Sequence, residues 1–165
     1  MNIKRIIKHL LTSEWQVNRH FPPAILNVIE QAIKASEVLH SGEIRFVVEG
    51  ALDGAALYKN QTAQARAVDI FSQLRVWDTE LNNGVLIYLL LADRDIEIIA
   101  DRGIHAKVGS AEWENICQKM ESCFKESHFQ QGVIAGIDAI TQHLQNHFPA
   151  INDDKNELSD KPIVM

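Results

Sequence analysis

The chain has 165 residues, of which 46% are hydrophobic, and its formal net charge is −6. This length and apolar content suit one domain with a sizeable buried core. The acidic balance argues against nucleic acid as a partner, because phosphate binding depends on clustered Lys and Arg. Cys117 and Cys123 lie on different faces of one predicted helix. We therefore expect two reduced thiols rather than a disulfide.

Residues 1–20 are predicted to form an N-terminal helical extension. The apolar side chains of this segment fall on one helical stripe and the basic ones on the other side: Ile3, Ile6, Ile7, Leu10 and Leu11 against Lys4, Arg5 and Lys8. A helix of this kind docks on the domain or, alternatively, lies on a membrane surface. The segment lacks an apolar run of signal-peptide length, and the longest apolar stretch of the chain, residues 85–92, is too short to cross a bilayer. We therefore expect a cytoplasmic protein.

A domain is predicted over residues 21–149, and its first half contains two strands and two helices. The first helix begins at Pro22-Pro23, where proline suits the first turn, and ends near residues 40–42. Residues 44–49 alternate as a strand, residues 50–59 form a loop, and residues 61–76 form a helix with Val68, Phe71 and Leu74 facing inward. Residues 85–92 are apolar on both faces, which predicts a central strand covered by helices on each side.

The second half of the domain adds a hairpin and two helices. Residues 95–100 form the return strand of the hairpin, and two amphipathic helices follow, which should bury Trp113, Met120, Phe124, Ile137 and Ile140. Residues 150–165 are polar and acidic, and we expect a disordered tail. A β-α-β unit is parallel, whereas a hairpin is antiparallel. The fold class is therefore α/β, a three-layer α/β/α sandwich with a mixed sheet and a central β-hairpin.

Polar side chains gather where the two hairpin strands begin and end. Because these strands are antiparallel, the residues before position 85 and those after position 100 meet at the same end: Asp78, Glu80, Asn82, Asn83, Asp101, Arg102 and His105. Oxygen ligands in this number are what a hard cation such as calcium requires. The alternative is that these Asp and Asn side chains cap helices and form turns.

The hairpin resembles the signature of the TPM domain family. Asn83-Gly84-Val85-Leu86, Asp93-Arg94 and Gly103-Ile104 match, in order and spacing, the Asn-Gly-Val-Leu strand, Asp-Arg turn and Gly-bearing loop of that family. The resemblance extends more thinly over residues 26–148. It implies a Rossmann-like α/β/α fold and a single-domain branch without a signal peptide or membrane helix, but no single activity.

The resemblance also bears on the metal site, because some TPM domains resemble calcium-binding modules. Relatives usually have a glycine where Asp101 stands, and acids where His105 and His128 stand. Imidazole is a poor ligand for calcium and suits transition metals. The candidate ligands of a divalent cation are Asp78, Asn82, Asn83, Asp101, His105 and His128, for calcium or, if the histidines take part, a transition metal. Alternatively, both histidines titrate near neutrality and bind nothing.

A second candidate site consists of Asp93, Arg94 and Arg102. An apolar strand followed by Asp-x-Asp resembles the nucleophile motif of the haloacid-dehalogenase phosphatases. Here, however, the chain returns directly as a strand, which favours a simple hairpin turn. Arg94 and Arg102 are the obvious candidates for a phosphate clamp, but no nucleophile stands beside a base.

Three functions follow from the resemblance. The first is a non-catalytic accessory domain that contacts another protein, possible partners including membrane-associated ones, since family members resemble factors for membrane-complex repair or receptor assembly. The second is a metal-dependent or acid phosphatase, since one branch of the family has that activity. The third is a structural partner for a membrane-anchored TPM paralogue. Because the sequence shows no catalytic pair, it favours the accessory role and assigns no catalytic residue.

Overall fold

The computed structural model describes residues 3–12, 14–151 and 155–165. In chain order the elements are α1 (Ile3–Leu11), α2 (Glu14–His20), α3 (Pro23–Glu37), β1 (Glu43–Glu49), α4 (Gly54–Tyr58), α5 (Ala63–Gln73), β2 (Gly84–Leu90), β3 (Asp95–Ala100), α6 (Arg102–Val108), α7 (Ser110–Lys125), α8 (Phe129–His147) and β4 (Ile163–Val164).

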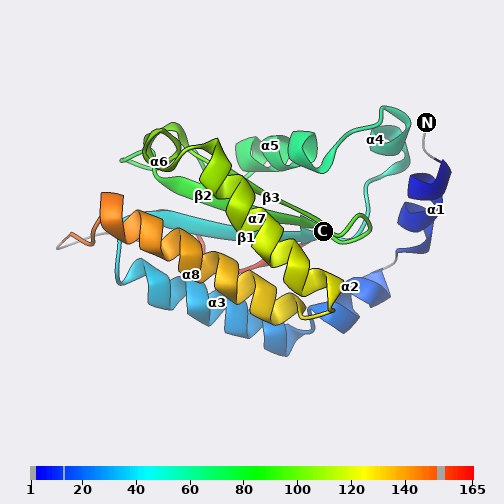
Figure 1. Ribbon diagram of the computed structural model, residues 1–165, viewed down its shortest axis with the longest axis horizontal. Coiled ribbons are helices and arrows are strands. Elements are labelled where there is room, and N and C mark those ends of the chain that lie inside the picture. The colour runs from blue at the N-terminus through cyan, green and yellow to red at the C-terminus, as the bar shows by residue number, and fades with distance from the viewer. Residues whose placement is uncertain (1–2, 13, 152–154) are drawn as a thin grey trace.

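The sheet is mixed, with the strand order β3-β2-β1-β4. β1 and β2 are parallel, with Glu43 opposite Gly84, and β2 and β3 are antiparallel, with Val85 opposite Ala100. The predicted interior position of the second strand is therefore confirmed. We call the end where β1 and β2 begin and β3 finishes the near end, and the end with the β2–β3 turn the far end. α6 lies at the near end and α1 at the far end (Figure 1).

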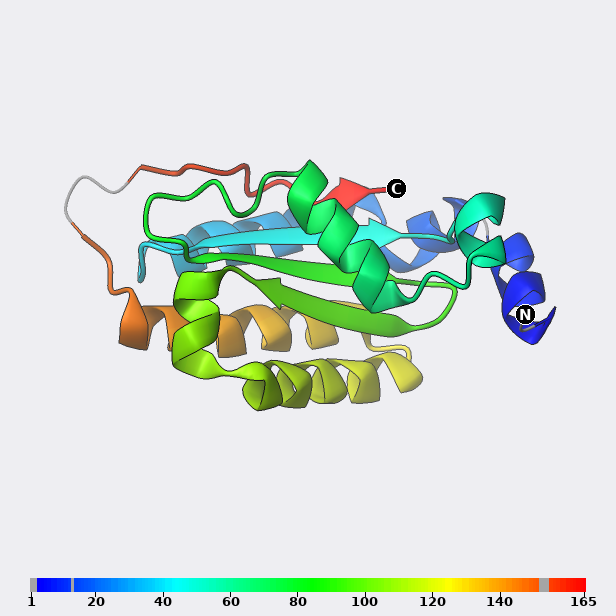
Figure 2. The ribbon, with the colours of Figure 1, turned by 90° about the horizontal axis from the view of Figure 1, so that it is seen from above.

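Helices cover both faces of the sheet, which confirms the three-layer sandwich. α7 and α8 lie on one side of the sheet and α5 on the other (Figure 2). Every residue of β2 is buried, and its side chains alternate between two cores. Val85, Ile87 and Leu89 join the core beneath α3, α7 and α8, whereas Leu86 and Tyr88 join the core beneath α5. This explains why the strand is apolar on both faces.

The predicted core of the last two helices is confirmed. Trp113, Met120, Phe124, Ile137 and Ile140 are all buried. The two helices approach closely, because a Cβ added to the glycine at position 136 would overlap the Met120 side chain. Glycine at this point therefore allows the backbone of α8 to pack directly against α7.

The other face of the sheet differs from the prediction in two details. α4 lies inside the segment expected to be a loop, and its N-terminus is capped by Asp53, whose side chain accepts a hydrogen bond from the amide of Ala56. On α5, Val68 is exposed, and the residues that face the sheet are Ala67 and Ile70 together with the first residue of the helix. Small side chains on this face let the helix lie close to the strands.

The C-terminal segment also differs from the expected disordered tail. Within its described part, Leu158 and Ile163 pack on the α5 core, and β4 pairs in parallel with β1. Glu43 holds this segment, because its carboxylate accepts the backbone N–H groups of Glu157 and Leu158 at 2.8 and 3.2 Å. The prediction of disorder rested on the few apolar residues and many acids of this segment. In the structure the segment covers an edge of the sheet that would otherwise be open.

Candidate functional site

Two glycines allow the near end of the sheet to close. A Cβ on Gly84 would overlap the carbonyl oxygen of Val76, and a Cβ on Gly103 would come within 2.5 Å of the carbonyl oxygen of Asn82. Backbone, rather than a flexible side chain, therefore occupies the space at both positions. The first contact closes the loop before β2 on itself, and the second packs that loop directly against the start of α6.

Asp101 sits between β3 and α6 and is buried. Its backbone N–H donates to the carbonyl of Gly84 at 2.8 Å, and its Oδ1 accepts the backbone N–H of Arg102 at 2.7 Å as the cap of α6. The capping alternative raised by the sequence therefore applies to one oxygen of this carboxylate. The other, Oδ2, is buried and has no hydrogen-bond partner among the described residues.

Asn83 precedes Gly84 and is fully buried. Its Nδ2 donates to the carbonyl of Ser41 at 2.9 Å, and this contact identifies the nitrogen end of the amide. Its backbone N–H donates to the hydroxyl of Thr79 at 3.1 Å. The remaining oxygen, Oδ1, is buried without a partner in the part of the chain that the structure describes. Asn83 and Asp101 thus each place one buried oxygen with unused acceptor capacity at the near end, and neighbouring backbone bonds hold both residues in place.

The other predicted ligands at this end lie nearer the surface. Asn82 has a positive φ of 54°, and its Oδ1 accepts the Arg102 Nε at 3.1 Å. Asp78 is exposed and lies 3.7 Å from Arg75. His105 Nε2 lies 3.5 Å from the Ser110 hydroxyl. These side chains lie at the same end of the sheet as Asn83 and Asp101, and each already has a protein neighbour.

His128 lies at the far end. It directly precedes Phe129, whose ring lies 4.4 Å from that of His20 in the N-terminal extension at a tilt of 43°. The His128 Nδ1 is 3.5 Å from Glu126. Within the described ranges, no three His, Cys, Asp or Glu side chains converge so as to hold a metal ion. The histidine-containing set is therefore not assembled, and the prediction of a cation site rests on the oxygens of Asn83 and Asp101.

The second candidate site is divided between the two ends. Asp93 and Arg94 lie in the β2–β3 turn at the far end, as the hairpin interpretation expects, whereas Arg102 begins α6 at the near end. Asp93 is held by the N-terminal extension: its Oδ2 accepts the Arg5 Nε at 2.8 Å and lies 3.2 Å from the His9 Nε2. No phosphate clamp results from this arrangement.

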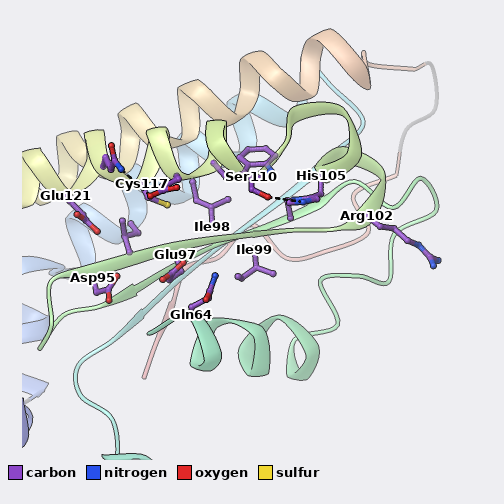
Figure 3. A pocket seen from close by; sticks show the side chains of 15 residues that line it. Gln64, Asp95, Glu97, Ile98, Ile99, Arg102, His105, Ser110, Cys117 and Glu121 are labelled. Carbon is purple, nitrogen blue, oxygen red and sulfur yellow. Dashed lines mark hydrogen bonds between the residues drawn. The ribbon is translucent and has the colours of Figure 1, made fainter. Parts of the chain in front are cut away.

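Sequence reasoning missed the groove that runs along β3. It encloses about 840 Å³ between α5 and α7, and Figure 3 shows the acidic side chains that line it. Asp95 and Glu97 come from the strand, and Glu114 and Glu121 from α7. Burial, and after it the charges of three neighbouring carboxylates, together raise the pKa of Glu97 to about 7. The sequence signal that could have indicated this groove is the presence of acids at alternate positions of the return strand.

A further group of acids lies at the near end beneath the C-terminal segment, where Glu43 and Asp160 are buried and Glu37 is half-buried. Burial, followed by the charges of Glu43 and Asp160, raises the pKa of Glu37 to about 9 in total. Burial also raises the pKa of Glu43. Arg45 is buried beside them, and this burial lowers the pKa of its guanidinium. These groups join the C-terminal segment to β1, and they lie under a part of the chain that the sequence left as a tail.

α5 lies in the connection between the parallel strands β1 and β2, and β3 adds an antiparallel hairpin. Helices cover both faces of this mixed sheet, so the fold is an α/β/α sandwich domain. The chain belongs to the TPM domain family, whose model matches residues 20–143. The matched range leaves α1 and nearly all of α2 outside the family domain.

Several solved structures are similar to this chain, and two of them are the following. The BA42 protein from the psychrophilic bacterium Bizionia argentinensis has 31% identity and a TM-score of 0.72, over 86% of this chain and 93% of that one. The N-terminal domain of a protein from P. gingivalis has 18% identity and a TM-score of 0.62, over 76% and 77%, and shows the fold alone. No curated protein matches the sequence. Among the described helices, none has the length and apolar character needed to cross a membrane.

Proposed function

We propose that this chain is a non-catalytic accessory domain that contacts another protein, and that a divalent cation at the near end fixes the contacting loops. The observation that carries the proposal is the pair of buried oxygens, Asn83 Oδ1 and Asp101 Oδ2, that lack partners among the residues described. A buried acceptor without a hydrogen bond costs about 1–3 kcal/mol. A hard cation would use both oxygens, which favours calcium over a transition metal.

A cation there would act on the shape of the near end. Asn83 belongs to the loop before β2, and Asp101 joins β3 to α6, so an ion bound by both would tie two segments together. The exposed groups around them, Asp78 and His105, would then be held in one arrangement towards a partner. A partner that is itself membrane-associated fits the accessory role expected from the sequence. In the structural-partner version of this proposal, the contacted protein is a membrane-anchored TPM paralogue.

Thermal unfolding of chelator-treated protein in calcium, magnesium, zinc or nickel tests the cation. A cation at about one hundred times its Kd adds about 2.7 kcal/mol, which raises Tm by roughly 5–10 °C in a domain of this size. We expect this rise with calcium. Asp101→Asn should abolish this rise. Asp78→Asn is the matched control: it makes the same chemical change at an exposed position and should preserve the rise.

The outcome that contradicts the cation is equally defined. If calcium leaves the parent unchanged, and Asp101→Asn melts well below the parent without any metal, then Asp101 is only the cap of α6. A calcium shift retained in Asp101→Asn would place the ion elsewhere.

A phosphatase is the second candidate, because the name of the matched family model, TPM_phosphatase, carries that activity. The described residues give it little support. Burial raises the pKa of the Cys117 thiol to about 12, so it is neutral near pH 7, and Asp93 is held by Arg5 and His9. Hydrolysis of p-nitrophenyl phosphate, with and without each metal, decides between the functions. We expect no turnover above buffer; turnover lost in Asp101→Asn would establish the phosphatase.

A further inference from the structure

The N-terminal helix α1 is docked by its polar side. His9 is buried, its Nδ1 accepts the backbone N–H of Leu52 at 3.0 Å, and Arg5 and His9 both contact Asp93. This arrangement reverses the usual one, in which the apolar stripe of a surface helix faces the core. Docking is confirmed, but it uses the face that carries Arg5 and His9.

The apolar stripe of α1 therefore points to solvent. Ile3 is 66% exposed, Leu10 77% and Leu11 70%, and Ile7 is also exposed. The next apolar side chain along the chain, Trp15, is 65% exposed and carries the guanidinium of Arg19 at 5.4 Å from its ring. Large apolar side chains gathered on one exposed face mark an interaction surface.

Charge separates this surface from the rest of the molecule. The first twenty residues hold four of the 16 Lys and Arg residues of the chain but only one of the 22 Asp and Glu residues. Lys4 and Lys8 are exposed, and at helical spacing they lie along one edge of the apolar stripe. Arg94, in the turn at this end, lies close enough to His20 to help lower its pKa, after burial and the charge of Arg19. An apolar stripe with basic residues beside it, on an otherwise acidic protein, complements an anionic lipid surface.

We propose that α1 and the start of α2 form a membrane-surface anchor that lies in the headgroup region of an anionic bilayer. Ile3, Ile7 and Leu10 would enter the boundary with the acyl chains, while Lys4 and Lys8 would reach lipid phosphates. Because α1 is fixed at the far end through Asp93, the near end would point away from the membrane. The anchor thus presents the opposite end of the sheet to the aqueous phase.

A second copy of the chain is a poorer occupant of this face. A two-fold contact through the stripe would place the same residues of both copies together, including Lys4 and Lys8. Like charges at an interface oppose association, whereas phosphate headgroups would neutralise both lysines. The stripe itself is limited to the nine residues of α1, which suits shallow insertion better than a stable protein interface.

Co-sedimentation of the full chain with vesicles tests the anchor. One set of vesicles is phosphatidylcholine alone, and the other mixes phosphatidylcholine and phosphatidylglycerol at about 2:1. We expect partitioning to be at least about tenfold stronger on the anionic vesicles and to weaken in high salt. Trp15 fluorescence should shift to the blue on binding, and Trp15→Phe should remove that shift.

Variants assign the binding to α1. The double substitution Leu10→Gln and Leu11→Gln should lower partitioning by about tenfold or more, because it removes apolar area from the stripe. Lys4→Gln with Lys8→Gln should lower it by about 25-fold on anionic vesicles only. The matched control is Val38→Gln with Leu39→Gln, which changes two exposed apolar residues just after α3 and should leave partitioning unchanged.

Three results would overturn the anchor. The first is a monomeric parent that binds neither kind of vesicle, which would leave a protein as the occupant of the stripe. The second is a parent that self-associates in sedimentation equilibrium and is dispersed by the Leu10 and Leu11 substitutions, without vesicle binding. The third is equal loss of binding in the Val38 and Leu39 control. Circular dichroism should show that all variants keep the parent fold, since every substituted side chain is exposed.

Discussion

The two ends of the β2–β3 hairpin each carry a partly or fully buried aspartate, and the fold treats them differently. At the far end, Asp93 is met by Arg5 and His9 from α1, so one carboxylate oxygen has two nitrogen neighbours. At the near end, Asp101 uses one oxygen to cap α6 and leaves the other buried without a described partner. At the far end, side chains of the protein itself contact the carboxylate, whereas at the near end one carboxylate oxygen has unused acceptor capacity. Unused capacity of this kind is where a ligand gains most from binding.

The two ends also differ in how tightly the backbone is packed, and one substitution made at each end measures this. Gly84→Ala at the near end should cost roughly 3 kcal/mol or more, because the new Cβ meets the backbone of Val76 and cannot push aside a flexible side chain. Gly54→Ala, just beyond β1 at the far end, meets nothing within 4 Å and should be neutral or stabilising by up to about 1 kcal/mol. Urea unfolding of both variants measures the difference. If both variants lost a similar free energy of unfolding, the near end could relax around the new Cβ, and the two ends would not differ in how tightly the backbone packs.

The aspartate pair provides the next largest contrast. Asp93→Asn should weaken the contacts to Arg5 and His9 by about 1.5–3 kcal/mol and loosen α1. Hydrogen exchange of the α1 amides and of the Leu52 amide, which donates to His9, should then quicken by about tenfold or more, while β2 stays protected.

The matching change at the near end is Asp101→Asn, made without metal. It should leave exchange nearly unchanged, because an asparagine oxygen can still cap α6. If Asp93→Asn left α1 fully protected, Asp93 would not be the group that completes the far end.

The smallest effect concerns pH and the buried acids of the near end. The pKa of Glu37 is raised from 4.5 to about 9, so above pH 4.5 the unfolded chain releases a proton that the folded chain keeps. The free energy of unfolding should therefore fall as the pH rises towards 9. His40 acts in the opposite direction, because burial lowers its pKa from 6.5 to about 4 and stability is lost as the pH drops through that range.

The contribution of Glu37 is therefore clearest between about pH 7 and 9, where it should amount to about 1 kcal/mol after allowance for its partial exposure. Urea titrations across this range should show the decline, and Glu37→Gln should remove it. Glu97→Gln is the control, since the pKa of Glu97 is raised only to about 7 and this group has finished titrating there. A slope that survives Glu37→Gln would assign the decline to another group.

The sequence predicted what depends on regular alternation and on glycine. A strand apolar on both faces, followed by an antiparallel return strand, was enough to place β2 inside the sheet and to bring residues 78–83 and 101–105 to one end. Gly84 and Gly103, which carry the family signature, stand where the backbones touch. These features are local, so a single sequence contains them.

The features that escaped prediction depend on contacts between distant segments. The stripe on α1 predicted a helix but not which face docks, because that was decided by Asp93, 88 residues from Arg5. On α5, the sheet selected small side chains such as Ala67, while Val68 stayed exposed. His128 was grouped with His105 through the family motif, although α7 runs from one end of the sheet to the other and separates them. The C-terminal acids looked like a disordered tail because their partners lie on β1 and α3.

The groove along β3 has a consequence for solubility. β1 is flanked by β2 and β4, but no strand in the described part of the chain pairs with the outer edge of β3. An open strand edge is a template for pairing between molecules, and charged side chains on it are a common protection. Asp95 and Glu97 would supply that protection by repelling the same residues of a second molecule. Because Glu97 loses its charge below about pH 7, the edge is best guarded in mildly alkaline solution, and acidification exposes it to edge-to-edge aggregation.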